Sequence, residues 1–373
     1  MPISPEEPQD FHFMRRALSL TRRGLGHSSP NPAVGAVVVA DGRVVGQGWH
    51  AKAGEPHAEV HALRQAGELA RGATIYVTLE PCHHAGRTPP CTKAVLAAGI
   101  KRVVYGASDP NPRVAGGGGR FLAEQGLAVT PGVLAPACEW EHRFFITHIT
   151  TGRPHVILKT AATMDGKTAS ATGHSRWVTG DPSRRFVHRV RGWVDAIMVG
   201  AGTALTDDPQ LTCRLVGRPN PLRVVVDSKL RLPVTAQVLD PAQGPGCLVA
   251  CLHDAPEDQA RRLTEAGAQV LRLPADDQGR VDLTALMDDL GARGVTSLLA
   301  EGGAGLAWSL LKGGLVDEVM YFFAPKLVGG ATAPGMVGGS GLERMDQAWQ
   351  LCRPVVRRFG DDVMLWAKTL GSA

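Results

Sequence analysis

The chain has 373 residues, of which 44% are hydrophobic and 20% are charged, so its composition excludes wholesale disorder and its length predicts two domains. No apolar run is long enough to cross a bilayer, and the N-terminus MPISPEEPQD is acidic and proline-bearing, unlike a secretory signal, so we expect a soluble protein. The formal net charge of +5, from 40 Lys and Arg against 35 Asp and Glu, is spread along the chain and fits small anionic ligands as well as nucleic acid.

Helices and strands alternate along the first half. Apolar residues at helical spacing predict a helix around residues 11–21, and Asp41-Gly42 between two valine-rich runs predicts a β-hairpin. The elements expected next are a helix at 58–70, a strand at 73–79, a helix at 92–98, a strand at 102–105, a glycine-rich turn at 116–119 followed by a helix, and a strand near 127–130. This alternation predicts a mostly parallel sheet that is covered on both faces.

The pattern restarts near residues 147–153, where the cluster of His and Cys residues ends, and this predicts domains at 1–149 and 150–373. Further strands are expected at 156–158, 196–199, 222–226, 247–250, 270–273, 297–300 and 318–323. Helices are expected at 183–191, 258–266, 283–291 and 305–311. Each half is therefore an α/β fold with enough residues to bury its own core.

A candidate metal site is formed by His57, Cys82 and Cys91. His57 begins the second predicted helix, and the two cysteines lie at the two ends of a loop between a strand and the next helix. One imidazole and two thiolates suit zinc, and three protein ligands leave a fourth position for water, as in catalytic sites. Zinc lowers the pKa of a bound water to about 7, and Glu59 is placed to carry protons to a leaving amine.

The cysteine pattern indicates zinc rather than disulfides. Seven cysteines without an even, secreted framework indicate a reducing, cytosolic setting, in which cysteine pairs bind metal more often than they form disulfides. The signature of zinc-dependent deaminases is H-x-E followed by P-C-x-x-C, but here eight residues separate the two cysteines. Two alternatives stay open: buried apolar cysteines, or a structural zinc with His61, His83 or His84 as a fourth ligand.

Glycine-rich turns in the second half give a weaker signal. Gly200-Ala201-Gly202 lacks the third glycine of the dinucleotide-binding fingerprint, because Leu205 occupies that place. The run from Glu301 to Gly305 follows an apolar strand and opens a helix, so its N–H groups suit a pyrophosphate. A tight structural turn explains that run equally well.

Motifs in both halves resemble the family of bifunctional riboflavin-biosynthesis deaminase–reductases. They include P-N-P-A-V-G at 30–35, E-P-C-H-H-A-G-R-T-P-P-C at 80–91, and the runs at 54–61, 108–112, 159–166, 175–179, 188–191, 200–209, 223–228 and 301–303. The resemblance covers nearly the whole chain and accounts for the wide cysteine spacing. It implies an N-terminal cytidine-deaminase-like three-layer α/β/α domain and a C-terminal dihydrofolate-reductase-like α/β domain that uses NADPH.

The resemblance also implies a substrate and roles in the deaminase half. The first half would hydrolyse an amine of a diaminohydroxypyrimidine that carries a phosphoribosylamino group, with zinc on His57, Cys82 and Cys91 and Glu59 as proton shuttle. Substrate contacts fall on Asn31, His50, His84, Arg87, Asp109 and Asn111. Ordinary turn residues would explain several of these positions as well.

In the second half, the resemblance implies reduction of the phosphoribosyl group to phosphoribityl. Cofactor contacts fall on Ala161, Trp177, Thr203, Asp207, Ser228, Gly303, Ala304, Gly305, Leu306, Ala307, Trp308 and Ser309. Substrate contacts fall on Ser175, Arg191, Leu211, Arg214 and Glu301. Lys159 would polarise or protonate the sugar as hydride arrives. Ser228, with Lys229 and Arg231, predicts a preference for NADPH over NADH.

Two other functions are weighed against this one. A tRNA or nucleobase deaminase with an accessory domain predicts a basic, aromatic-bearing face around the pocket. A non-catalytic binding module stabilised by zinc predicts a fourth protein ligand and no need for Glu59. We expect a small phosphorylated pyrimidine as the partner, one zinc per chain, a cytoplasmic homo-oligomer, and no nucleic acid or membrane.

Overall fold

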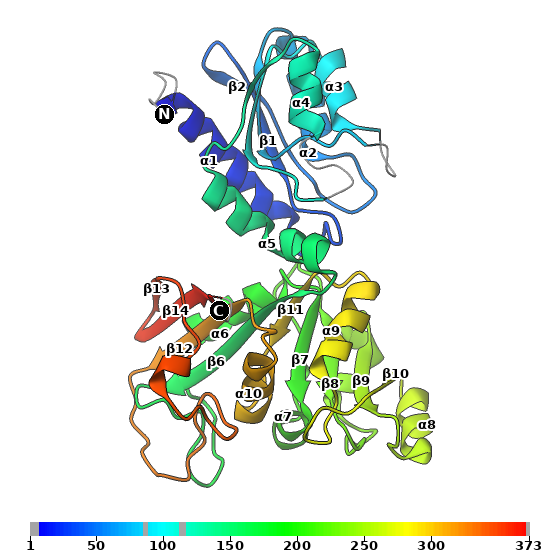
Figure 1. Cartoon of the computed structure of the whole chain (residues 1–373), viewed down its shortest axis with the longest axis vertical. Helices are drawn as coiled ribbons and strands as arrows, with labels where there is room; N and C mark the ends of the chain where they lie inside the picture. The colour runs from blue at the N-terminus through cyan, green and yellow to red at the C-terminus, as the bar shows by residue number, and fades with distance from the viewer. Residues whose placement is uncertain (1–6, 85–88, 112–116, 371–373) are drawn as a thin grey trace. The chain divides into compact units, whose positions relative to one another are not determined.

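A computed structural model describes residues 7–84, 89–111 and 117–370, and its chain divides into two compact units, Met1–Gly152 and Arg153–Ala373 (Figure 1). Each unit has its own sheet and its own apolar core. Helix α5 (Ala135–Thr151), which the sequence patterns did not predict, runs past residue 149 and ends at Gly152, whose φ of +80° favours glycine. None of the helices that the structure describes is long and apolar enough to span a membrane.

The first unit contains a five-stranded sheet with the strand order β2-β1-β3-β4-β5. Its strands are β1 (Gly35–Ala40), β2 (Arg43–Trp49), β3 (Thr74–Leu79), β4 (Arg102–Ala107) and β5 (Ala128–Thr130). The expected hairpin is confirmed, with Asp41 and Gly42 both at positive φ in its turn. The expectation of a mostly parallel sheet is wrong for this unit, because β1 pairs antiparallel with both β2 and β3 and only β3–β4 and β4–β5 are parallel.

Helices cover both faces of this sheet, as the three-layer prediction requires. They are α1 (Glu7–Gly24), α2 (Ala58–Ala66), the 3₁₀ turn η1 (Gly67–Ala70), α3 (Cys91–Ala97), α4 (Gly117–Glu124) and α5. Helices α1 and α5 pack on one face, and α2, α3 and α4 pack on the other (Figure 1). The glycines expected to form a turn at 117–119 instead form the first turn of α4, where a Cβ on Gly118 would lie 1.8 Å from the Pro81 carbonyl oxygen. Only glycine allows this helix to begin directly against the Pro81 backbone.

The second unit contains a nine-stranded sheet with the order β10-β9-β8-β7-β11-β6-β12-β14-β13, parallel from β10 to β12. Its strands are β6 (His155–Thr163), β7 (Ala196–Gly200), β8 (Leu222–Val226), β9 (Cys247–Leu252), β10 (Ala268–Leu273), β11 (Ser297–Ala300), β12 (Glu318–Ala324), β13 (Val355–Phe359) and β14 (Asp362–Lys368). All the predicted strands are confirmed. The antiparallel hairpin of β13 and β14 was not predicted, since β13 is largely exposed and has no buried alternating face.

Helices again pack on both faces of the second sheet. They are α6 (Asp181–Arg191), α7 (Ala201–Asp207), α8 (Glu257–Glu265), α9 (Leu283–Ala292) and α10 (Ala304–Lys312), with 3₁₀ turns η2 (Gln237–Leu239), η3 (Pro241–Gln243) and η4 (Met345–Gln347). Helix α7 was not predicted, because Gly200-Ala201-Gly202 was considered only as an incomplete dinucleotide-binding fingerprint. Helices α7 and α10 directly follow the central strands β7 and β11, at the strand ends where parallel sheets place ligands.

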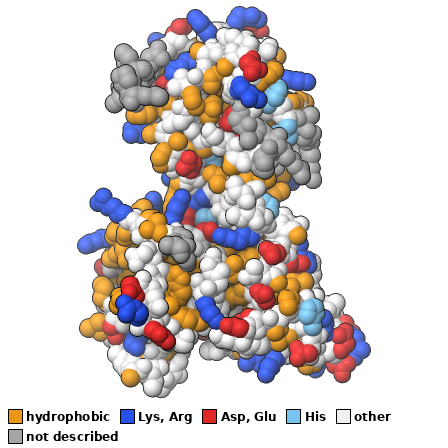
Figure 2. Space-filling view, in the orientation of Figure 1, with side chains coloured by type: hydrophobic (Ala, Val, Ile, Leu, Met, Phe, Trp, Pro, Cys, Tyr) orange, Lys and Arg blue, Asp and Glu red, His pale blue; other side chains and the backbone are white. Residues whose placement is uncertain are grey.

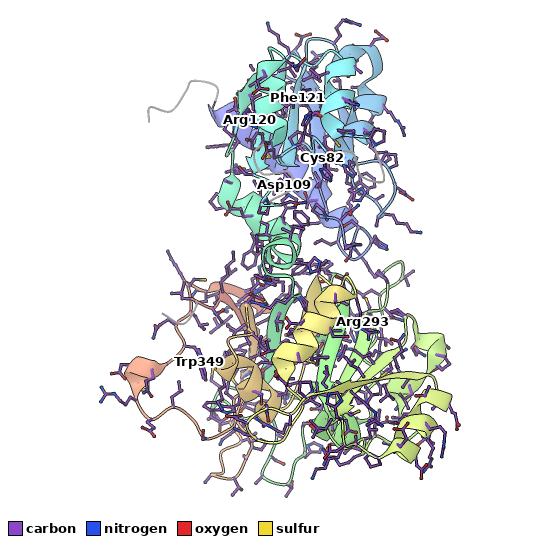
Figure 3. All side chains as sticks on the ribbon, turned by 45° about the vertical axis from the view of Figure 1, so that its right-hand side comes forward. Cys82, Asp109, Arg120, Phe121, Arg293 and Trp349 are labelled. Atoms are coloured by element: carbon purple, nitrogen blue, oxygen red, sulfur yellow. The ribbon has the colours of Figure 1, made fainter. Side chains whose placement is uncertain are left out.

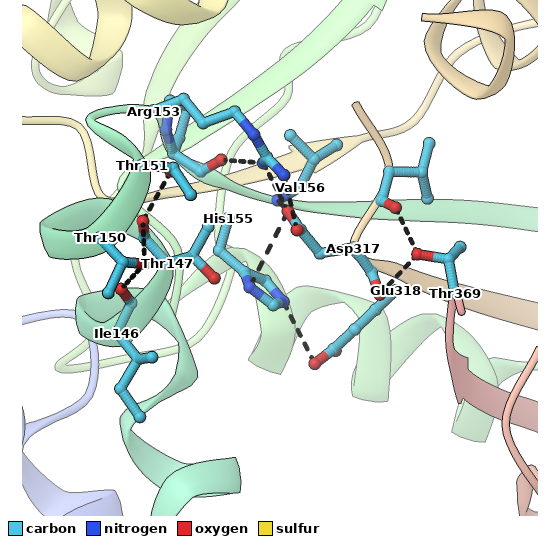
Figure 4. Close-up of polar contacts among 12 residues, drawn as sticks. Ile146, Thr147, Thr150, Thr151, Arg153, His155, Val156, Asp317, Glu318 and Thr369 are labelled. Atoms are coloured by element: carbon cyan, nitrogen blue, oxygen red, sulfur yellow. Dashed lines mark hydrogen bonds and ion pairs between the residues drawn. The ribbon is translucent and has the colours of Figure 1, made fainter. Parts of the chain in front are cut away.

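A buried polar network fixes the start of β6 against β12 and β14 (Figure 4). Arg153 donates to both carboxylate oxygens of Asp317, at 2.7 and 2.8 Å. Nε2 of His155 lies 3.1 Å from Oε1 of Glu318, and the indole N–H of Trp366 donates to Oε2 of Glu318 at 2.7 Å. Because these groups are partnered, the polar residues at the starts of β6 and β12 do not interrupt the core.

Candidate active sites

Three elements of the first unit bring His57, Cys82 and Cys91 together. His57 directly precedes α2, Cys82 lies in the loop after β3, and Cys91 is the first residue of α3. Nδ1 of His57 lies 3.1 Å from Sγ of Cys91 and 3.6 Å from Sγ of Cys82, and all three atoms lie within 4.8 Å of one another. One nitrogen and two sulfur donors at these separations fit the ligand set of a tetrahedral zinc ion.

No fourth His, Cys or acidic residue joins this donor set within residues 7–84, 89–111 and 117–370. The ring of His83 stacks on Phe121 with centroids 3.9 Å apart, and its Nδ1 lies 3.1 Å from Oγ1 of Thr92. His61 and His84 are outside the donor set as well. The geometry therefore favours a three-ligand catalytic site over the structural zinc that was left open.

Glu59 lies in the first turn of α2 and is only 3% exposed. Burial, reinforced by the neighbouring Cys82, raises the pKa of the Glu59 carboxyl to about 7. A hydrogen bond with Cys91 lowers the pKa of the Cys82 thiol, which favours the thiolate form that binds zinc. A carboxyl with a pKa near 7 can both accept and release a proton at neutral pH.

Two of the predicted substrate residues lie beside the metal ligands. Nδ1 of His50 donates to the carbonyl of Pro56 at 3.2 Å, and Nε2 lies 3.2 Å from the amide nitrogen of Asn31. Burial lowers the pKa of His50, so its neutral ring accepts the Asn31 hydrogen through Nε2. The ring centroids of His50 and His57 are 5.1 Å apart. Asn31 and His50 thus form one wall of the metal site.

The residues Asp109 and Asn111 follow β4 in the same unit as Cys82 (Figure 3). Oδ1 of Asp109 accepts the N–H of Asn111 at 2.9 Å, and burial raises the pKa of the Asp109 carboxyl. The charges of His84 and Cys82 also act on this carboxyl, so both lie near it. Arg87, also predicted to contact substrate, lies outside the described residues.

A cavity of about 920 Å³ in the second unit lies at the end of the central strands. The predicted residues that line it are Lys159, Ala161, Ser175, Trp177, Arg191, Thr203, Asp207, Leu211, Arg214, Glu301, Gly303 and Ala304. These residues come from β6, α6, α7, the start of α10 and the loops around them, so the fold brings together segments that are far apart in sequence.

A cluster of three charged side chains lies in the wall of this cavity. Nε and Nη2 of Arg191 donate to the two carboxylate oxygens of Glu301 at 2.8 and 3.0 Å, and Nζ of Lys159 lies 3.6 Å from Oε2. Burial alone would raise the pKa of Glu301, but Arg191 and Lys159 outweigh it and lower the pKa to about 2. Arg191 thus has a protein partner, whereas the neighbouring Arg214 is exposed to the cavity.

A second cavity of about 360 Å³ lies between β8 and α10. Of the predicted cofactor residues it is lined by Ser228, Gly305, Leu306 and Ser309, and three further cations, Lys229, Arg231 and Arg280, lie around it. The remaining two, Ala307 and Trp308, are buried and line neither of these cavities, because they face the core from α10. Both cavities are lined by residues of α7 and of the α10 start, so they adjoin there.

Several residues in these sites were missed. Arg184, His188 and Asp208 also line the larger cavity, and Arg184 lies over the ring of Trp177 at 4.5 Å. Arg184 and His188 could have been identified from the amphipathic pattern of α6, because that helix buries Phe186 and leaves its cations on the other face. In the first unit, the missed residue is Glu80, a charged residue that directly follows the apolar strand β3 and is buried.

Two family models match the chain. Residues 7–107 match the cytidine and deoxycytidylate deaminase zinc-binding region, and residues 154–365 match the RibD C-terminal domain. Riboflavin biosynthesis protein RibD of Actinobacillus pleuropneumoniae is 42% identical over 356 residues, which cover 95% of this chain and 94% of that protein. RibD of Escherichia coli (strain K12) is 42% identical over 370 residues, which cover 96% and 98%. The chain belongs to the RibD family.

Solved RibD structures agree with this assignment. RibD of Acinetobacter baumannii (form 1) is 37% identical with a TM-score of 0.86, and covers 98% of this chain and 100% of that one. A diaminohydroxyphosphoribosylaminopyrimidine deaminase/5-amino-6-(5-phosphoribosylamino)uracil reductase from Thermotoga maritima is 35% identical with a TM-score of 0.85 and the same coverage. This RibD-family chain is therefore a bifunctional deaminase and reductase of riboflavin biosynthesis, with a zinc-binding deaminase domain and an NADPH-using reductase domain. The predicted family, fold class, activities and cofactors are confirmed, and the two alternative functions are not supported.

Proposed function

We propose that residues 1–149 deaminate diaminohydroxyphosphoribosylaminopyrimidine and that residues 150–373 reduce the product, 5-amino-6-(5-phosphoribosylamino)uracil, to its ribityl form. The observation that carries this proposal is the pair of dissimilar sites, a three-ligand metal site beside buried Glu59 and a cation-lined cavity around Lys159 and Glu301. The similar protein from Thermotoga maritima is named for these two activities, and it covers 98% of this chain.

In the deaminase half, His57, Cys82 and Cys91 would hold zinc, which supplies a water of lowered pKa when it is bound. Glu59 accepts a proton from the attacking water as the water oxygen bonds to the ring carbon. Glu59 then donates a proton to the amine, the carbon–nitrogen bond breaks, and ammonia leaves. A pKa near 7 suits both transfers. The substrate contacts proposed around this centre are Asn31, His50, His84, Arg87, Asp109 and Asn111.

In the reductase half, NADPH supplies the hydride when it is bound. Nζ of Lys159 lies 3.6 Å from the Glu301 carboxylate, which holds the Lys159 side chain in the wall of the cavity. We propose that Lys159 donates a proton to the ring oxygen of the ribose as C1 receives the hydride and the bond between C1 and that oxygen breaks, which opens the ring to the ribityl chain. We propose that the exposed guanidinium of Arg214 pairs with the sugar phosphate, whereas Arg191 contacts substrate from its place beside Glu301. Ser175 and Leu211 complete the substrate contacts.

The two adjoining cavities fit an elongated dinucleotide. We propose that its nicotinamide end enters the larger cavity beside Ala161, Trp177, Thr203 and Asp207, and that the turn at 303–309 contacts the pyrophosphate at the start of α10. Its adenosine end then reaches the smaller cavity at Ser228. Cations around that cavity would favour the extra phosphate of NADPH.

We further propose one zinc per chain, a cytoplasmic setting, a homo-oligomer, and no binding of nucleic acid. All seven cysteines are free, as a reducing compartment requires. Lys and Arg side chains are scattered over the face drawn in Figure 2 and do not gather in one patch of the kind that binds nucleic acid.

The test uses the zinc-loaded enzyme with the diaminopyrimidine phosphate and NADPH. Ammonia release and loss of nicotinamide absorbance are followed together, and we expect equal amounts of ammonia and oxidised cofactor. A tRNA and a free nucleobase serve as control substrates and should release no ammonia. Ammonia release from either control, or NADPH oxidation without the pyrimidine, would contradict the proposal.

A further inference from the structure

We infer that Glu80 is a positioning residue for deamination, which holds the Asp109–Asn111 segment and the start of α4 beside the metal ligands. Glu80 lies between β3 and the Pro81-Cys82 pair and is only 3% exposed. The inference rests on the proposed substrate contacts of Asp109 and Asn111, and it assigns Glu80 no contact with substrate or metal.

Both carboxylate oxygens of Glu80 accept backbone hydrogen bonds from outside its own strand. Oε1 accepts the N–H of Gly119 at 2.8 Å, and Oε2 accepts the N–H of Asp109 at 3.2 Å. The Glu80 N–H itself donates to the carbonyl of Ala107 at 2.9 Å, so β3 and the end of β4 are joined at the same point. One side chain thus connects two segments that are ten residues apart in the chain.

Only a carboxylate can make this connection at this site. An ionised Glu has two acceptor oxygens and no donor, whereas the amide of Gln would place an NH₂ group against one of the two backbone N–H groups. Gly119 is the third residue of α4, where unpaired N–H groups and the helix dipole favour a negative charge. These contacts compensate the cost of burying the Glu80 charge.

Each segment that Glu80 holds leads to the metal site. On one side, Asp109 accepts the N–H of Asn111, so fixing the Asp109 backbone fixes both proposed contacts. On the other side, α4 places Phe121 against His83, the neighbour of Cys82. If Glu80 were shortened or neutralised, the zinc ligands would still be held by the elements that carry them. The Asp109 backbone, however, would lose its hydrogen bond to Glu80.

The test compares Glu80→Gln with Glu141→Gln in the full-length, zinc-loaded enzyme. Glu141 is also a buried carboxylate of the first unit, but it pairs with Arg22 and lies on α5. For Glu80→Gln we expect a loss of about 10- to 100-fold in deaminase kcat/KM, with a raised KM, because small displacements of a positioned group reduce rates on this scale. Zinc content and the reduction of the deaminated intermediate should be unchanged. Glu141→Gln should keep full deaminase kcat/KM.

A double-mutant cycle with Asp109→Ala separates positioning from a general structural role. If Glu80 acts through Asp109, the double variant should be no slower than Asp109→Ala alone, and hydrogen exchange at the Asp109 amide should quicken in Glu80→Gln. Additive losses, or loss of zinc in Glu80→Gln, would overturn the inference. Should Glu80→Gln unfold, Glu80→Asp, which keeps the charge on a shorter side chain, must show the same raised KM with zinc retained. If Asp109→Ala itself leaves the KM unchanged, the proposed substrate role of Asp109 fails, while the amide exchange still reports on Glu80.

Discussion

The two candidate active sites each contain a glutamate that is largely shielded from solvent, and the two carboxyl groups differ in charge because their neighbours differ. Glu59 lies beside thiols and a histidine, and burial raises the pKa of its carboxyl to about 7. The Glu301 side chain is 11% exposed, and Arg191 and Lys159 lower the pKa of its carboxyl to about 2. Burial favours the neutral acid, and only adjacent cations reverse that preference. The same side chain thus suits proton transfer in one unit and permanent charge in the other.

This difference agrees with the chemistry proposed for each half. Deamination needs a group that both takes and returns a proton near pH 7, which is the behaviour of Glu59. Reduction needs a proton donor and a fixed charge pattern around a phosphorylated sugar. An ionised Glu301 provides that pattern, because it pairs with Arg191 and lies 3.6 Å from Nζ of Lys159.

The largest effect is expected when the carboxyl group of Glu59 is replaced by an amide, which cannot transfer a proton at neutral pH. Glu59→Gln should reduce deaminase kcat by about 10²- to 10⁴-fold, the usual range for a general acid–base group, and should retain zinc. The reduction of the deaminated intermediate should continue at the normal rate, since the residues assigned to that step lie in the other unit. Ammonia release and NADPH oxidation are measured separately. If a well-folded variant lost both activities, two independent sites would be the wrong description.

The next largest effect is expected at the charge cluster of the second unit. Glu301→Gln leaves Arg191 and Lys159 without their shared partner, and removal of one member of a buried ion pair typically costs about 3–5 kcal/mol of folding stability. We expect reductase kcat/KM to fall by about 100-fold, since the cluster that is proposed to position substrate is lost. Deamination should be unaffected. Urea unfolding and both activity assays check this, and a variant with normal reduction would show that Glu301 has no role in positioning.

The metal site was predictable from sequence, whereas the charge cluster was not. His57 and Cys91 lie at helix starts and Cys82 lies in a short motif after a strand, and local spacing was enough to group them. Arg191 and Glu301 are 110 positions apart, and their contact depends on β11 lying between β7 and β6, an order that no local pattern encodes. Resemblance to the family identified both residues but not their mutual bond.

The fold shows the same division between local and non-local information. The predicted strands were all found, because each is a short apolar run between turn residues. Helix α5 was missed since its buried residues include the polar Glu141, His142 and Arg143, which obscure an apolar face. Similarly, the hydrogen bonds of Glu80 depend on Gly118 fitting against Pro81, a close approach visible only once the two segments are packed.

Acid titration sharpens the comparison of the two glutamates. The pKa of Glu301 is depressed to about 2 from an ordinary 4.5, so its ionisation contributes stability that is complete above about pH 4.5 and is lost as the pH falls toward 2. At 1.36 kcal/mol per pKa unit, the contribution is about 3 kcal/mol. Urea unfolding between pH 5 and pH 2 should therefore show a shallower acid-dependent loss in Glu301→Gln than in the unaltered protein. Parallel curves for the two proteins would contradict the depressed pKa.

The smallest effect is expected where cations surround an open cavity instead of a buried acid. Lys229 is exposed, and Arg231 and Arg280 have side chains 59% and 40% exposed, so water already stabilises their charges. Arg280→Ala should lower kcat/KM for NADPH by about tenfold, equivalent to about 1.4 kcal/mol, through loss of one charged hydrogen bond to the 2′-phosphate. The value for NADH should not change, since that cofactor lacks the phosphate. Arg262→Ala on α8, which is outside both cavities, is the matched control and should leave the NADPH to NADH ratio unaltered. An equal loss of kcat/KM with both cofactors would assign Arg280 a structural role. Lys229 and Arg231 would then be the residues expected to bind the 2′-phosphate.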